Sequence, residues 1–173
     1  FKDVFSIIVN KNIVKDTISF LNAAQNMDYP VKVKAGRYRL TKDMSNRSLI
    51  NMLKAGNQEA VKLKFQNIRK IDGLASLLAK NLEPDSAAFM RLLDSAAYVE
   101  KFGFNTETVY TMFIPNTYEM WWNTSPQEFF KKMNTEYLKF WNDERRKKAA
   151  ALGLAPIKAT ILASIVDAEA LYD

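Results

Sequence analysis

Hydrophobic residues in this chain repeat with two different periods, and each period is found in its own parts of the sequence. In residues 31–40 and 61–65 apolar and basic residues alternate, which is the pattern of a half-buried strand. Elsewhere apolar residues recur every three or four positions, as on one face of an amphipathic helix. A chain that combines a few short strands with many helices is expected to adopt an α+β fold.

The alternating segments enclose a helical one, so residues 31–65 are predicted to form strand, helix and strand. Ser45 can cap the helix at its start, and Gly56 is suited to end it. A module of this size buries little core by itself and should pack on the helices that precede it. Residues 1–66 are therefore predicted to form the first domain, with a helix at the chain start and another that Asp16 can cap. Ile18, Leu21 and Ala24 are expected near one face of this second helix.

Helical periodicity continues beyond residue 66, and residues 67–173 are predicted to form a second, mostly helical domain. Asp85 and Ser125 are suited to cap two of its helices. The pattern fails at residues 113–118, where a loop is expected. A last helix is predicted to begin at Pro156 and to reach the chain end.

The chain contains neither cysteine nor histidine. This composition excludes cysteine nucleophiles, Ser-His-Asp triads and the usual zinc sites. Any catalysis must rest on carboxylates, lysines, tyrosines or hydroxyl groups. We expect no metal and no cofactor.

The formal net charge is +6. It can reflect a solvated lysine-rich surface, or attraction to an anionic polymer or membrane surface. Neither basic cluster carries the aromatic and glycine pattern of an RNA-binding sheet, so nucleic acid is disfavoured as a partner. The clusters consist of Lys32, Lys34, Arg37 and Arg39, and of residues 145–148.

The last predicted helix is almost entirely apolar up to Val166, so it should be buried on most sides. Asp167 and Glu169 follow. Residues two apart on a helix point roughly 200° apart, so these carboxylates cannot flank one bond. Glu169 shares its stripe with Leu162 and Val166, and a carboxyl among apolar side chains keeps its proton near neutral pH, as a general acid needs. The alternative is a solvated residue at a helix end.

Aromatic residues are frequent between residues 113 and 122. Their flat faces could stack on sugar rings, and Asn116 and Thr117 could form hydrogen bonds to a sugar. The alternative is that these aromatics pack in the core. The aromatic residues are Phe113, Tyr118, Trp121 and Trp122.

Three segments, in order, resemble motifs of the YceG-like (MltG) family of endolytic murein transglycosylases. Residues 34–40 resemble the Lys-x-Gly-x-Tyr-x-Phe entry to its LysM-like subdomain. Residues 113–118 resemble its Phe-Pro-Asp-Thr-Tyr loop. Residues 162–169 resemble its signature helix, which typically reads Ala-Ser-Ile-Val-Glu-x-Glu-Thr. The resemblance implies that residues 1–66 contain a LysM-like module and that residues 67–173 begin a YceG-like catalytic domain.

The resemblance also implies an activity. Family members cleave nascent glycan strands between N-acetylmuramic acid and N-acetylglucosamine and leave 1,6-anhydro ends. The catalytic acid of the signature corresponds to Glu169, and Asn116, Tyr118 and Asp167 fall at positions expected to contact substrate. Asp167 stands where the family has Glu, and Asn116 stands where it has Asp.

The resemblance further implies a bacterial inner-membrane protein with its domain facing the periplasm. A single N-terminal membrane helix is expected upstream of Phe1, and the family's chain continues beyond Asp173, so this fragment is expected to be truncated and inactive. The expected partners are peptidoglycan glycan strands, and cell-wall synthesis proteins are further candidates.

Two other functions are alternatives. One is a non-catalytic protein that binds peptidoglycan or acts as a cell-envelope scaffold. The other is a pyridoxal-phosphate lyase, a name that family members have carried. That chemistry needs a Schiff-base lysine in a phosphate-binding pocket, and the chain has no glycine-rich phosphate loop.

Overall fold

The structure is a computed structural model that describes residues 1–66 and 71–169. This part of the chain is mostly helical and holds one two-stranded antiparallel sheet, which confirms the α+β prediction. It divides into two compact units, one of Phe1–Val61 with Trp121–Asn123 and one of Lys62–Met120 with the chain from Thr124 onward. The assignment of residues 1–66 to a LysM-like module stays a prediction.

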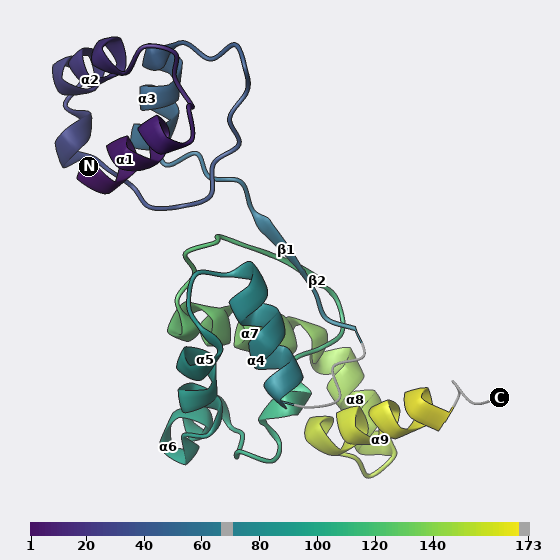
Figure 1. The fold of residues 1–173 in the computed structure, drawn as a ribbon. Helices are drawn as coiled ribbons and strands as arrows, with labels where there is room; N and C mark the ends of the chain where they lie inside the picture. Colours follow the sequence, from purple (N-terminus) through teal and green to yellow (C-terminus); the bar gives the residue numbers. More distant parts are fainter. Residues whose placement is uncertain (67–70, 170–173) are drawn as a thin grey trace. The chain divides into compact units, whose positions relative to one another are not determined.

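The first unit is a small helical cluster. The predicted N-caps are confirmed: the Asp16 carboxylate accepts hydrogen bonds from the backbone N–H groups of Ile18 and Ser19, and Ser45 Oγ accepts one from Ser48. Gly56 ends the third helix at a φ of 77°, where a side chain would be strained. The elements are α1 (Lys2–Asn10), α2 (Thr17–Asn26), the short 3₁₀ helix η1 (Tyr29–Val31) and α3 (Asn46–Ala55) (Figure 1).

Buried apolar side chains from every one of these helices form the core of the first unit. Phe20 and Ile50 are fully buried, and Phe20 lies 6.5 Å from the Phe5 ring. Ile18, expected on the inner face of α2, is instead 71% exposed, because that face centres on Phe20 and Ala24. The core consists of Ile8, Phe20, Ala24, Tyr29, Leu49, Ile50 and Leu53.

The strand predicted at residues 31–40 is wrong, since no strand forms there. Val31 ends η1 and is 83% exposed. Among the described residues, a single backbone hydrogen bond, from Glu59 N to Arg37 O, joins this segment to the chain before β1. The Gln58 side chain fills the space beside Gly36, only 2.2 Å from where a Cβ would lie. A short alternation of apolar and basic residues was therefore not sufficient to form a hydrogen-bonded strand pair.

The second unit combines the sheet with most of the helices. The predicted strand at residues 61–65 is confirmed, with Val61 and Leu63 buried and both lysines exposed. Its elements are β1 (Val61–Lys64), α4 (Ile71–Asn81), α5 (Ser86–Leu93), α6 (Ala96–Val99), η2 (Glu100–Phe102), η3 (Val109–Met112), β2 (Thr117–Met120), α7 (Pro126–Phe140), α8 (Asp143–Ala151) and α9 (Pro156–Glu169).

Phe129 on α7 lies at the centre of an aromatic cluster in the second unit. It is fully buried, and its ring centroid lies 5.6 Å from Phe89, 5.7 Å from Phe113 and 5.8 Å from Phe130. Phe65 approaches to 6.2 Å from the end of β1. These edge-on and stacked contacts link α5, α7 and the sheet around one core.

The loop predicted at residues 113–118 is wrong at its end, because β2 begins at Thr117. β2 pairs with β1, and the backbone oxygen of Asn116 extends the pairing by accepting from Phe65 N at 2.9 Å. The alternation of exposed and buried residues in β2 is clear in the structure. It was hidden in the sequence by the surrounding aromatic residues.

Replacing Ser125 with alanine should lower the free energy of unfolding by about 1 kcal/mol at pH 7, because it removes the capping box of α7. Ser125 Oγ accepts from Glu128 N at 3.3 Å, and the Glu128 carboxylate accepts from Ser125 N at 2.9 Å. The hydrogen bond from the Ser125 hydroxyl, and then that from its backbone N–H, lower the pKa of Glu128. The stabilisation by this carboxylate is therefore present above the ordinary pKa of Glu and lost as the pH falls through the lower folded value.

Urea unfolding at pH 7 and at pH 3 measures this difference. The cost of Ser125→Ala should be smaller at pH 3 than at pH 7, because the stabilisation by the Glu128 carboxylate is lost as the pH falls through its lowered pKa. Ser45→Ala is the matched control, since Ser45 caps α3 without a carboxylate partner and should cost the same at both pH values. An equal pH dependence of the two variants would contradict the assignment to Glu128.

Candidate functional site

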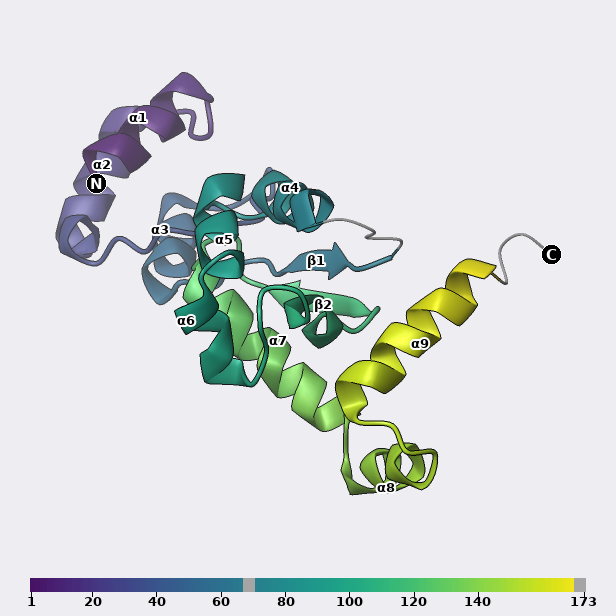
Figure 2. The same cartoon turned by 90° about the horizontal axis from the view of Figure 1, so that it is seen from below.

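The helix that carries the predicted acid begins at Pro156, as expected, and follows α8 after a bend of 76° (Figure 2). It contacts α8 and η3. Its hydroxyl groups are satisfied within the helix: Thr160 donates to Pro156 O and Ser164 to Ile161 O. The predicted continuation over residues 170–173 lies outside the described residues.

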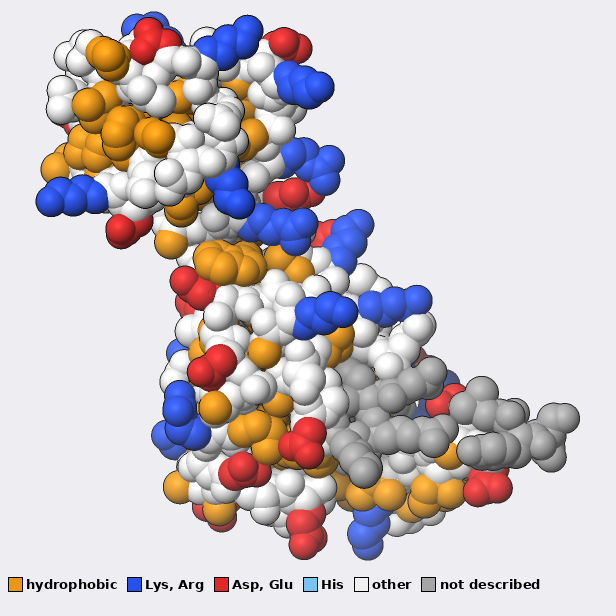
Figure 3. Space-filling view, in the orientation of Figure 1, with side chains coloured by type: hydrophobic (Ala, Val, Ile, Leu, Met, Phe, Trp, Pro, Cys, Tyr) orange, Lys and Arg blue, Asp and Glu red, His pale blue; other side chains and the backbone are white. Residues whose placement is uncertain are grey.

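The prediction that this helix is buried on most sides is wrong, since none of the described residues of α9 is buried. Residues 156, 157, 159 and 160 are half-buried, whereas residues 161–167 are all exposed. Four apolar side chains form a continuous exposed stripe, and Figure 3 shows hydrophobic side chains on the surface in this region. They are Ile161 (43% exposed), Leu162 (49%), Ile165 (53%) and Val166 (60%). The apolar composition of this helix predicted that other residues bury it, but it could not predict which residues do so.

Glu169 is the last residue of α9, and its side chain is exposed. Asp167 is exposed as well, and helical geometry directs the two carboxylates to opposite sides, roughly 200° apart. Among the described residues neither carboxylate has an ion-pair partner. Each carboxyl is therefore accessible to a large ligand, and neither has the other beside it.

Asn116 and Tyr118 lie at the start of β2. Asn116 is exposed, and its Oδ1 accepts from Thr117 N at 2.8 Å. Tyr118 is only 6% exposed, and its hydroxyl donates to Ile114 O at 2.6 Å. Burial, with a smaller contribution from the Glu136 carboxylate, raises the pKa of Tyr118 to about 12. Tyr118 therefore holds the preceding loop in shape, and Asn116 is the residue of this pair that solvent reaches.

The aromatic residues of this segment divide into core and surface side chains. Phe113 stacks on Phe129, and Tyr118 packs 5.1 Å from Phe65. Trp122 is half-buried, whereas Trp121 is 51% exposed. The packing alternative thus holds for Phe113 and Tyr118, and Trp121 retains an open ring face.

Replacing Tyr118 with phenylalanine should lower the free energy of unfolding by about 1 kcal/mol, because the Ile114 carbonyl loses its donor while the ring still packs. Thermal or urea unfolding measures the change. Tyr98→Phe is the matched control: Tyr98 is half-buried, its hydroxyl makes no hydrogen bond among the described residues, and the change should cost less than about 0.5 kcal/mol. Unchanged stability together with weaker glycan binding would instead indicate that the Tyr118 hydroxyl contacts substrate.

The second basic cluster stabilises the junction between α7 and α8. Arg145 lies 4.3 Å from the Phe140 ring centroid and donates to Phe140 O, and Arg146 Nε donates to Trp141 O at 2.6 Å. These bonds satisfy carbonyl groups at the C-terminal end of α7. A structural role therefore accounts for both arginines.

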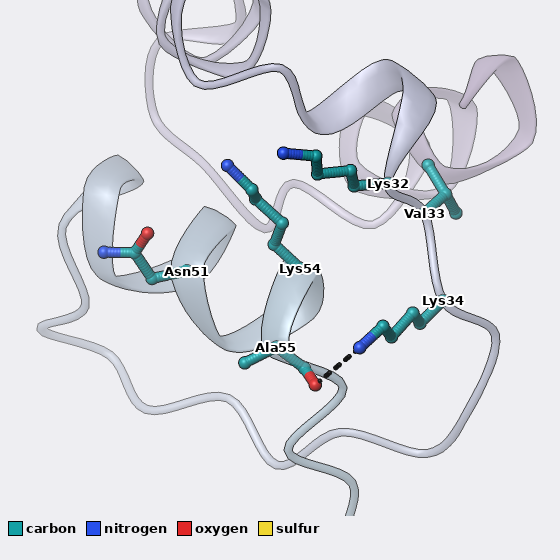
Figure 4. A pocket seen from close by; sticks show the side chains of 6 residues that line it. All are labelled: Lys32, Val33, Lys34, Asn51, Lys54 and Ala55. Atoms are coloured by element: carbon teal, nitrogen blue, oxygen red, sulfur yellow. Dashed lines mark hydrogen bonds between the residues drawn. The ribbon is translucent and has the colours of Figure 1, made fainter.

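The residues of the first basic cluster lie in different surroundings. Arg39 forms an ion pair with Glu59, and the hydrogen bond from Arg39 lowers the pKa of that carboxyl. Lys32 and Lys34 instead line a pocket together with Lys54, a residue that sequence reasoning missed (Figure 4). Lys54 lies at the C-terminal end of α3, and no local pattern indicates that residues 32–34 approach it.

In the part of the chain that the structure describes, no three His, Cys, Asp or Glu side chains gather where they could hold a metal ion. Within that same part, no single helix has the length and apolar composition needed to cross a membrane. Only α8 and α9 taken together meet that requirement, and the pair is bent.

The model of the YceG-like family matches residues 1–173. No curated protein and no solved structure matches the chain. Because the family model covers every residue, the chain belongs to the YceG-like family, which is known as a family of murein transglycosylases.

Proposed function

We propose that the protein is an endolytic lytic transglycosylase, which cleaves peptidoglycan strands between N-acetylmuramic acid and N-acetylglucosamine. The observation that carries the proposal is the family match over residues 1–173, which includes the segment that ends in Asp167 and Glu169. Glu169 is exposed among the described residues, so a polymer can reach the carboxyl, but the enclosure by apolar side chains that was expected for this general acid is not formed there.

In this mechanism Glu169 serves in both proton transfers. The protonated carboxyl donates its proton to the glycosidic oxygen as the bond to the anomeric carbon breaks. The resulting carboxylate then accepts the proton of the C6 hydroxyl of the same muramoyl residue, while that oxygen bonds to the anomeric carbon. The products are a 1,6-anhydro end and a new hydroxyl on the leaving sugar, and Glu169 is protonated again.

The reaction needs neither water nor a second carboxylate beside the first. A hydrolase would require two carboxyl groups that flank the scissile bond. The divergent directions of Asp167 and Glu169 along α9 agree with the single-carboxyl mechanism. Asp167 is therefore assigned to substrate contact and not to proton transfer.

Asn116 is the second proposed substrate contact, because its side chain is exposed beside the ordered start of β2. Tyr118, also proposed at this site, would act through the loop that it holds, since its hydroxyl is bonded to Ile114 O. We further propose that the protein works on the periplasmic side of the bacterial inner membrane, anchored by a single N-terminal helix, with glycan strands and cell-wall synthesis proteins as partners.

Product analysis tests the proposal. The intact protein is incubated with purified glycan strands, and the new chain ends are identified by mass spectrometry. An endolytic lytic transglycosylase cuts within long strands, and each cut leaves a new 1,6-anhydro end. New reducing ends would instead identify a hydrolase, and binding to peptidoglycan without new ends would favour the non-catalytic binding protein.

A further inference from the structure

A concave surface in the first unit lies outside the proposed catalytic residues. It has a volume of about 590 Å³ and is widely open to solvent. The end of α3 forms one wall and the chain just after η1 forms the other (Figure 4). The lining residues are Lys32, Val33, Lys34, Asn51, Lys54 and Ala55.

Two of the three lysines are held in place by backbone carbonyl groups. Lys34 Nζ donates to Ala55 O at 3.0 Å, and Lys54 Nζ donates to Met27 O at 2.5 Å. Each ammonium group has three donors, so both retain donors for a ligand. Lys32 makes no side-chain hydrogen bond among the described residues, and Figure 4 shows its side chain extending in the same direction as that of Lys54.

The positive charge of this pocket is not neutralised by nearby acids. No carboxylate lines it. The ion pairs formed within the described residues involve other cations, namely Arg39, Lys62, Lys139 and Lys148. The partial negative charge at the C-terminal end of α3 offsets only about half of one charge. Lys34 is turned toward Ala55 O, so the ammonium groups of Lys32 and Lys54, whose side chains extend in the same direction, are the ones that favour an anionic ligand.

The apolar part of the lining limits the choice of anion. Val33 and Ala55 provide aliphatic surface beside the ammonium groups, and the Asn51 amide can donate or accept a hydrogen bond. A short peptide that ends in a small aliphatic residue matches this combination, because its carboxylate and its side chain are adjacent. A neutral sugar would leave these charges without a partner.

We propose that this pocket binds the carboxylate end of a short peptide, namely the stem peptides carried by the glycan strands that the proposed function takes as substrate. The inference rests on the proposed function for the identity of the polymer. The pocket would select strands that still carry their peptides, separately from the cleavage step at Glu169.

Binding of defined probes to the 173-residue chain, followed by calorimetry and by NMR shifts of the α3 amides, tests this. The probes are a disaccharide-peptide, the same molecule with its peptide carboxylates amidated, and the peptide-free disaccharide. We expect the first to bind at least tenfold more tightly than the other two. Lys32→Gln should weaken its binding about tenfold, as expected for the loss of a hydrogen bond between charged groups.

Lys11→Gln is the matched control, since it removes the same charge from an exposed lysine that does not line the pocket. Its affinity should stay within twofold of the wild type. Three results would each overturn the proposal. They are equal binding of the peptide-free disaccharide, an equal effect of Lys32→Gln and Lys11→Gln on binding, and binding only to vesicles of anionic phospholipid. These experiments measure binding and not cleavage, so a negative result here does not affect the product analysis. A negative product analysis likewise does not decide whether the peptide binds this pocket.

Discussion

The Glu169→Gln variant of the intact protein is expected to release 1,6-anhydro ends about 10²–10⁴-fold more slowly than the wild type, because that is the usual contribution of a general acid-base group. Glutamine preserves the size and hydrogen bonding of the side chain but cannot transfer the proton. Glu169 is exposed at the end of α9, so the change should leave the free energy of unfolding nearly unaltered. The rate is measured from anhydro-muropeptides by liquid chromatography and mass spectrometry.

Two controls separate loss of the acid from loss of charge. Glu83→Gln removes an exposed carboxylate elsewhere in the second unit and should retain full activity. Asp167→Asn changes the neighbouring carboxylate that points away from Glu169, and it should affect KM more than kcat. Glu169→Gln with near wild-type activity would refute the assigned role, whereas equal loss in both α9 variants would point to a shared structural effect.

Truncation of Phe129 to alanine is expected to lower the free energy of unfolding by about 3–5 kcal/mol, the range for a buried phenylalanine. Its ring contacts several aromatic neighbours in the core of the second unit, and little space is available for them to close the cavity. This loss is a large fraction of the about 5–15 kcal/mol that stabilises a typical domain. Urea unfolding followed by tryptophan fluorescence measures it.

Leu138 offers a control on the same helix. It is 51% exposed on α7, so Leu138→Ala removes apolar atoms and keeps helix propensity without opening a cavity. Its cost should stay below about 1 kcal/mol. Similar losses for the two variants would indicate that the aromatic cluster is less tightly packed than the structure describes.

The sequence predicted helices well where their signals are local. Asp16, Ser45 and Ser125 were recognised as caps because each acts on N–H groups within three residues of it. Residues 31–40 and β2 were assigned wrongly because a strand depends on a partner that can lie far along the chain. β1 was expected to join a module with residues 31–40, but it pairs with Thr117–Met120.

The candidate site was less predictable than the fold. Asp167 and Glu169 were placed on the last helix correctly, since apolar composition and Pro156 indicate a helix. The same composition led to the wrong expectation of burial, because hydrophobicity does not reveal which segment covers a surface. The lysine pocket was missed because Lys54 and Lys32 meet only through the tertiary fold.

The pairing of β1 with β2 encloses α4, α5 and α6 within one long loop of chain. Bringing the ends of such a loop together costs entropy before the strands gain any hydrogen bond. Local helices can form within microseconds, so the strands are expected to join after them. On a ribosome, β1 would leave the exit tunnel well before its partner, and the short sheet would form only after α4, α5 and α6 have emerged.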